Sequence, residues 1–319
     1  MSKTVKIWLI VALALVVAGL VICCAGMMAI DWDFTKLSTY SYEDNEYVIN
    51  EKFENIYVKT SEADISFLKS ENGETKVLCH EKSGEKHSVK VSNGTLVIEV
   101  SDQKWYEKIG INFGIPKLTV YLPESEYNEL IVNVSTGDVA LPENARFKNV
   151  DVSGSTGDII SYSLNAETVK FKVSTGKISV NEMRTNSICA NANTGDIDFT
   201  DVVCMGDISL GVSTGKTRLN VVNCRSLVSI GGTGDISLES VIATEKLDIK
   251  RSTGDVSFKG SDANAIFVKT STGDVCGSLL SDKVYITNTS TGNINVPNSI
   301  VGGRCEITTS TGDIKITVN

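Results

Sequence analysis

The chain has 319 residues, of which 41% are hydrophobic and 22% are charged, a composition typical of a folded protein. The net charge is −9, and because Lys3 and Lys6 precede an apolar N-terminal segment, the remainder carries −9 − 2 = −11. Such a chain lacks the basic face that nucleic-acid binding requires, so nucleic acid is excluded as a partner. His80 and His87 lie outside the repetitive region, which removes most histidine-dependent catalysis from it.

The first element is an uncharged apolar stretch, residues 7–30. A helix of this length exceeds the roughly 30 Å hydrocarbon core, whereas the apolar region of a cleaved signal peptide is usually only about 7–15 residues long. Lysines precede the stretch and acidic residues follow it. The positive-inside rule therefore predicts a cytoplasmic segment 1–6, a transmembrane helix, and an extracellular remainder attached to the cell membrane.

Residues 31–50 are predicted to form a stalk, and residues 51–122 an N-terminal β cap. The cap contains short alternating apolar segments, and Asn93-Gly94 is a strong hairpin signal. Ser61-Glu-Ala-Asp64 resembles a degenerate form of the motif that recurs later in the chain, which predicts one degenerate coil here. Such a cap would cover the open core of the repeats that follow.

Residues 123–319 contain a repeated motif, Ser-Thr-Gly-Asp or a near variant of it. Its glycines recur every 19 or 20 residues, at Gly137, Gly157, Gly176, Gly195, Gly215, Gly234, Gly254, Gly273, Gly292 and Gly312. Apolar residues keep fixed offsets from each glycine with period two, as Val139/Leu141 and Ile236/Leu238 do, which predicts short strands with one buried face. A β-propeller is the alternative fold, but each of its blades needs about 40 residues, which is about twice the repeat length. We therefore predict an all-β parallel β-solenoid of about ten coils.

The motif itself is interpreted as a structural corner. Glycine permits the positive φ that a turn requires, and the neighbouring Ser, Thr and Asp can bond backbone groups stripped from the ladder. Stacked aspartates would also suit Ca²⁺. However, Lys177, Lys216 and Asn293 interrupt the acidic column and relieve its repulsion. We expect no cofactor, with Ca²⁺ on the acidic face as the alternative.

Six cysteines follow the predicted membrane span. Cys204 and Cys224 each lie nine residues after a corner glycine, so they should stack in a column otherwise filled by alanine. Buried thiols acting as small apolar groups explain this pattern, and a disulfide between the two is the alternative. The cysteine spacing fits no paired zinc motif.

The repeat and the segment Leu118-Thr-Val-Tyr-Leu-Pro123 before it resemble the bacterial putative-adhesin family of β-strand-repeat proteins, which includes LiaG-like envelope proteins. The resemblance covers about residues 50–319. It implies a surface or envelope role and supplies no catalytic residues.

We therefore predict a non-enzymatic, membrane-anchored surface protein, either an adhesin or a cell-envelope stress-response module that binds an envelope or extracellular protein or glycan. One alternative is a self-assembling scaffold, because the final strand Ile314–Val318 ends the chain without a distinct cap. Another is a glycan-active β-helix enzyme, but the constant repeat length leaves no inserted loops for a catalytic site. No catalytic residue is predicted.

Two groups of residues remain as weaker candidates for function. Asp198, Asp201 and Asp207 cluster in sequence, although acidic residues on solvated strands are common. Trp105, Tyr106 and Phe113 could form a sugar-binding platform, although core packing is the commoner role of such residues.

Overall fold

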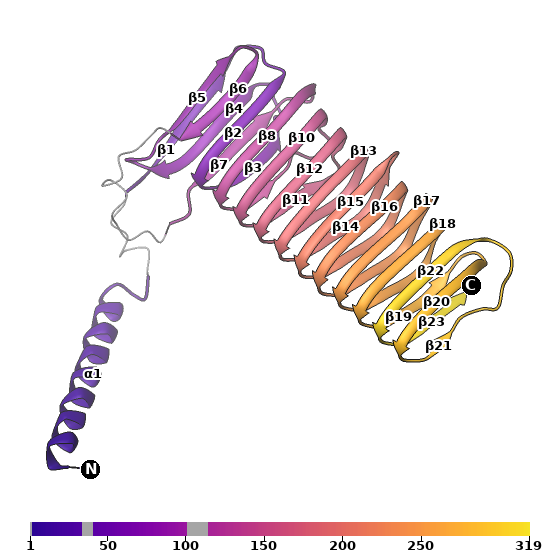
Figure 1. The fold of residues 1–319 in the computed structure, drawn as a ribbon. Coiled ribbons are helices and arrows are strands. Elements are labelled where there is room, and N and C mark those ends of the chain that lie inside the picture. Colours follow the sequence, from indigo (N-terminus) through magenta and orange to yellow (C-terminus); the bar gives the residue numbers. More distant parts are fainter. Residues whose placement is uncertain (1, 34–40, 101–113) are drawn as a thin grey trace.

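The computed structural model describes residues 2–33, 41–100 and 114–319 (Figure 1). Its single helix, α1 (Lys3–Ala29), begins at Ser2, whose side chain accepts a hydrogen bond from the Val5 amide. The helix is long and apolar enough to cross a membrane, and none of its most apolar window is buried against the rest of the chain. All other elements within these described residues are strands.

Seven strands lie at the N-terminal end: β1 (Tyr42–Ile49), β2 (Asn55–Glu62), β3 (Asp64–Lys69), β4 (Thr75–Lys82), β5 (His87–Ser92), β6 (Thr95–Val100) and β7 (Lys117–Leu122). The stack of coils follows. On its first face lie β8 (Glu126–Thr136), β10 (Arg146–Thr156), β12 (Asn165–Thr175), β15 (Asp207–Thr214), β20 (Lys283–Thr291) and β22 (Gly303–Thr311). On its second face lie β9 (Val139–Ala140), β11 (Ile159–Tyr162), β14 (Ile197–Cys204), β19 (Val275–Leu279), β21 (Ile294–Asn295) and β23 (Ile314–Val318). Four strands run continuously from the second face into the first face of the next coil: β13 (Ile178–Thr194), β16 (Thr217–Thr233), β17 (Ile236–Thr253) and β18 (Val256–Thr272).

The prediction of a parallel β-solenoid is confirmed. Within the stack, strands pair in parallel with the equivalent strands of the neighbouring coils, as β10 does with β8 and β12. Inward side chains form continuous columns across the coils. One of these columns contains Val132, Val152, Phe171, Ala190, Leu210, Ser229, Ile249 and Val268. Each fully buried Val, Leu, Ile or Phe in such a column contributes about 1.5–3 kcal/mol, so the columns hold the stack together.

Each coil turns at two corners. The first is the Ser-Thr-Gly-Asp motif, where every glycine has φ between +129° and +152°. At the second corner one residue in each of seven successive coils has φ near +50° in the left-handed region: Asn144, Ser163, Glu182, Asp201, Val221, Ser240 and Gly260. These residue types differ, so the sequence analysis missed the second corner. Its left-handed residue is set by the coil rather than by local preference.

At the N-terminal end, β2 and β3 form the degenerate coil expected around Ser61, pairing in parallel with β8 and β9. On their other side they pair with β6 and β7, which come later in the sequence. The antiparallel strands β4 and β5 then pair with β7 and β6. β4 and β5 therefore run against the direction of the coils, whereas β1, antiparallel to β4, runs with it.

The expectation of a stalk as far as residue 50 is wrong for Tyr42–Ile49. These residues form β1, which pairs antiparallel with β4 along its whole length. Asp44 and Glu46 face outward, while Tyr47 and Ile49, on the other face of the strand, pack against the core.

At the C-terminal end the last two coils are exchanged in space. β18 pairs with β22, and β19 pairs with β23, so the coil containing Gly312 lies against the coil containing Gly273. The earlier coil, β20 and β21, lies outside it (Figure 1). The expectation that the final strand leaves an open end is therefore wrong, because β23 lies between β19 and β21. The outermost coil is instead β20–β21.

Replacing a corner glycine should be far more costly than replacing a glycine at the second corner. A Cβ on Gly215, at φ +146°, would lie 2.0 Å from the Gly195 carbonyl oxygen, so the backbone of one coil would have to move. Gly260, at φ +58°, has only a side-chain carbon of Leu280 nearby, at 3.8 Å, and Asn144 occupies the equivalent position.

We expect Gly215→Ala to destabilise the protein by about 3 kcal/mol or more, and Gly260→Asn to change its stability by about 1 kcal/mol or less. Urea unfolding of the full chain in mild detergent, followed by circular dichroism, measures both. Equal midpoints for the two variants would contradict the close approach of the corners.

Candidate binding groove

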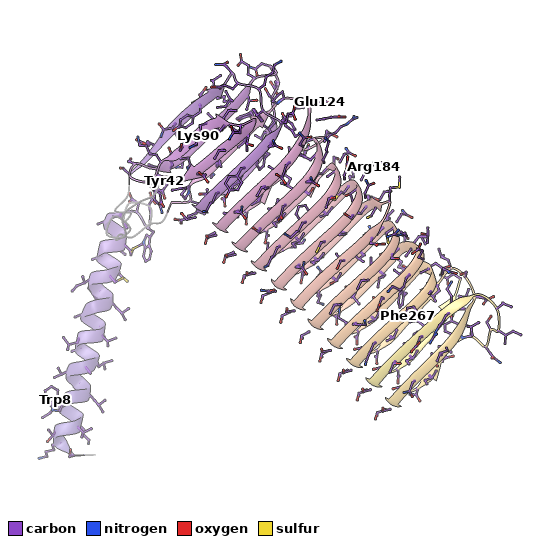
Figure 2. The ribbon with its side chains drawn as sticks, turned by 45° about the horizontal axis from the view of Figure 1, so that its top comes forward. Trp8, Tyr42, Lys90, Glu124, Arg184 and Phe267 are labelled. Carbon is purple, nitrogen blue, oxygen red and sulfur yellow. The ribbon has the colours of Figure 1, made fainter. Side chains whose placement is uncertain are left out.

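A groove follows the second corner across the first coils of the solenoid. One part has a volume of about 720 Å³ and the adjoining part about 410 Å³. Asn165, Arg184 and Val203 line both parts, so the two form one continuous depression. Arg184 projects from the edge of the solenoid opposite the corner glycines (Figure 2).

The groove arises from a change of side-chain size within one column. Tyr127 and Phe147 occupy adjacent coils with their rings stacked 5.3 Å apart, and both are buried. The next residues in register are Ala166 and Thr185. The coils keep their spacing while the side chains shrink, so the surface is hollowed where the rings end. Burial raises the pKa of Tyr127 to about 12, and its hydroxyl donates to the Pro123 carbonyl at 3.0 Å.

Charged side chains of both signs line the groove. Arg146 pairs with Glu126 at 3.2 Å, in the column that continues through Asn165 to Arg184. Within residues 2–33, 41–100 and 114–319, Arg184 and Lys148 have no carboxylate partner. The groove therefore offers two unpaired cations and several polar groups, which suits an extended polar ligand with acidic groups.

The aspartates of the first corner connect neighbouring coils through hydrogen bonds. The Asp138 carboxylate accepts the backbone N–H of Asp158 at 2.8 Å, and Asp158 accepts that of Lys177 at 2.7 Å. The same contact recurs from Asp64 at the degenerate coil to Asp313 at the other end. Each such oxygen stands in for a backbone acceptor at the turn, which explains why the motif ends in aspartate.

Two lysines interrupt this ladder and pair with acidic groups of the next coil instead. Lys177 contacts Asp198 at 2.7 Å, and Lys216 contacts Asp235 at 3.1 Å. The backbone N–H of Asp255 and then the Lys216 ammonium lower the pKa of Asp235. The carboxylates are therefore stabilised in their charged form by groups of the protein itself.

Asp198, Asp201 and Asp207, the acidic cluster of the sequence analysis, do not form a pair of carboxylates that could act together in catalysis. Asp198 is held by Lys177 and by Arg218, at 2.9 Å. Asp207 receives two hydrogen bonds from Arg225, which lower its pKa. Asp201 is the left-handed residue of a second corner. The Asp198 and Asp207 carboxylates are thus engaged in ion pairs of the scaffold, whereas Asp201 lines the groove.

Cys204 and Cys224 are buried free thiols in the small-residue column, where Thr185 precedes Cys204 and Ala243 follows Cys224. Burial raises the pKa of Cys224 to about 12. Both cysteines therefore pack as small apolar groups in this structure.

One cluster with metal-ligand chemistry lies in the N-terminal strands and was not singled out from the sequence. Potential ligand atoms of Cys79, Glu81 and His87 lie within 4.8 Å of one another, and all three residues are buried. However, one Glu81 oxygen accepts from Asn45 at 2.7 Å, and the other contacts the backbone N–H and Nδ1 of His87, both at 2.6 Å. These contacts tie β1, β4 and β5 together, and a metal would have to displace them.

The aromatic residues proposed as a sugar platform, Trp105, Tyr106 and Phe113, lie outside the described residues. The groove was not anticipated from the sequence, because it depends on which side chains stack across coils. The groove could be recognised from the change from the large Tyr127 and Phe147 to the small Ala166 within one column. That change can be seen only when the strand register is known.

Comparison with known protein families shows which family the chain belongs to. Residues 53–211 and 182–319 match the Toastrack DUF4097 family. The chain belongs to this family. No curated protein matches it.

Several solved structures have a similar backbone fold at low sequence identity. A putative adhesin from Bacteroides fragilis is 14% identical, with 87% of this chain and 97% of that chain covered and a TM-score of 0.39. A putative lipid binding protein from Parabacteroides distasonis is also 14% identical, with 88% and 98% covered and a TM-score of 0.48. A putative adhesin from the same species is 11% identical, with 87% and 98% covered and a TM-score of 0.32. These similarities concern the backbone and carry no functional assignment.

Removing divalent cations should leave the solenoid unchanged, because amide groups already occupy the corner carboxylates. We expect the melting temperature of the full chain to be the same in excess EGTA and in millimolar Ca²⁺. Differential scanning calorimetry measures this directly. A melting temperature that falls on chelation and recovers with Ca²⁺ would show that the acidic face binds calcium.

Proposed function

We propose that this protein is a non-enzymatic surface module of the cell envelope, anchored by α1, that binds an envelope or extracellular partner through the groove at the second corner. The observation that carries the proposal is the groove itself. Equivalent positions of successive coils line it, and Arg184 and Lys148 are unpaired within the described residues. A repeating surface of this kind suits an extended protein or glycan chain.

The arrangement of the chain supports this location. Lys3 and Lys6 precede the apolar helix and acidic residues follow it, which favours a cytoplasmic N-terminus and an extracellular solenoid. Membership of the Toastrack DUF4097 family adds no catalytic residue. The ion-paired aspartates described above favour binding over catalysis.

An acidic ligand is the chemistry that the free cations suit best. The ectodomain carries −11, so long-range attraction does not bring an acidic polymer to it, and short-range contacts must supply the affinity. An exposed guanidinium without a carboxylate partner keeps its full set of donors for a ligand, and it can hold a carboxylate or phosphate through two parallel hydrogen bonds.

Binding of purified cell-wall glycan fragments to the full chain in nanodiscs tests this proposal. Arg184→Ala should weaken binding by about tenfold, because it removes a charge-assisted contact of about 1.4 kcal/mol. Lys269→Ala is the matched control. Lys269 is an exposed cation on β18 that has no ion pair among the described residues and does not line the groove.

Equal affinity for the Arg184 and Lys269 variants would exclude the groove as the binding site. Depolymerisation of the glycan by the wild-type protein, lost on replacing a surface carboxylate, would instead favour the enzyme alternative.

A further inference from the structure

The end of the solenoid far from the N-terminal cap strands has an unpaired edge. β20 pairs only with β22, and β21 only with β23, among the described strands. The outer side of this coil therefore presents a row of backbone N–H and C=O groups without a neighbouring strand. Exposed edges of this kind are templates for pairing with another chain.

Natural edge strands usually carry charged residues that prevent such pairing, but this coil carries none after Lys283, the first residue of β20, which is buried and pairs with Asp262. Residues 284–303 contain no Asp, Glu, Lys or Arg. The next longest uncharged run after residue 50 is 185–195. Even the corner of the end coil has Asn293 where most coils have aspartate. In an ectodomain of charge −11, the free edge of this coil is thus neutral beyond its one buried, ion-paired lysine.

The same coil also exposes apolar side chains. Ile286 on β20 and Ile294 on β21 are about half exposed, and Ile300 in the segment leading to β22 is 90% exposed. Ile294 lies in the inward column of Ile314 and Val275, so its exposure comes from the open end of the core. The end coil therefore combines a free backbone edge with an uncovered piece of core.

The opposite end of the solenoid differs on each point. Its outer strand β1 carries Glu43, Asp44 and Glu46, which pair with Lys86, His80 and Lys76. The adjoining strands β4 and β5 run antiparallel to the coils. Head-to-tail stacking would press the neutral end coil against this charged surface and bury its ions at a cost.

We propose that the β20–β21 coil is the interface at which two copies of this chain pair end to end. A two-fold axis places β20 of one copy antiparallel to β20 of the other, so the two neutral edges complete each other's hydrogen bonds. Ile286, Ile294 and Ile300 of both copies are then covered together. The neutrality of this coil selects the partner, because two copies that carry −11 each can meet without repulsion only where their charges are absent.

The proposal does not depend on the groove, which lies at the other end of the stack. It gives the self-assembling scaffold a definite form, a closed pair rather than an open fibre, because a two-fold interface uses up both free edges. The anchors of the pair then lie at opposite ends of the assembly.

Sedimentation velocity of the full chain in detergent measures the association. We expect a dimer whose dissociation constant rises by about tenfold or more in Ile286→Lys, because the two-fold axis brings both new charges to the same interface. The matched control is Ile230→Lys, which places a lysine at an isoleucine of similar exposure on β16, a strand paired on both sides. This control should dimerise like the wild type.

Ile300→Lys provides a second test should Ile286→Lys fail to fold, since Ile300 lies almost fully in solvent. A wild-type chain that remains monomeric at about 100 μM would overturn the proposal. It would also be overturned by a dimer that neither end-coil variant weakens, because the contact would then lie elsewhere, as in the apolar helix.

Discussion

The whole solenoid depends on how closely the backbones of successive coils approach at the Ser-Thr-Gly-Asp corner. A side chain on any of these glycines would collide with a backbone carbonyl of the adjacent corner in the stack, as it would for Gly215 on Gly195. This contact fixes the axial spacing and register of each coil. The aspartate then bonds the amide of the next corner, and the apolar columns align because the corners do. Stacking, core and groove all follow from this one constraint.

The sequence was sufficient to predict the repeating part, because the 19–20-residue spacing and the period-two apolar pattern both act within single coils. It was insufficient at the second corner, where a residue as unsuited as Val221 adopts φ +53°. The stacking of the coils imposes that conformation, so it cannot be predicted from the local preference of the residue. The ends were also missed. The exchange of the last two coils depends on which free edge each coil finds, which chain order does not encode.

The candidate groove also could not be predicted from the sequence. Tyr127, Phe147 and Ala166 are unremarkable in sequence, and they define a depression only after register stacks them. We therefore propose that the binding positions of this protein are defined by columns of stacked residues rather than by the repeated motif. The conspicuous motif serves the scaffold, whereas the less regular positions, the groove cations and the neutral end coil, are where we propose that partners bind.

The central claim, that each coil is an interchangeable unit fixed by its corner, is tested most directly by deleting one coil. Removing residues 177–195 joins Gly176 to Asp196 and restores the motif, so every remaining coil keeps its register. This variant should fold and melt cooperatively, with β-sheet circular dichroism like that of the parent. Removing only residues 177–186 shifts every later column out of register and should abolish folding. If both deletions were equally damaging, the account would be contradicted.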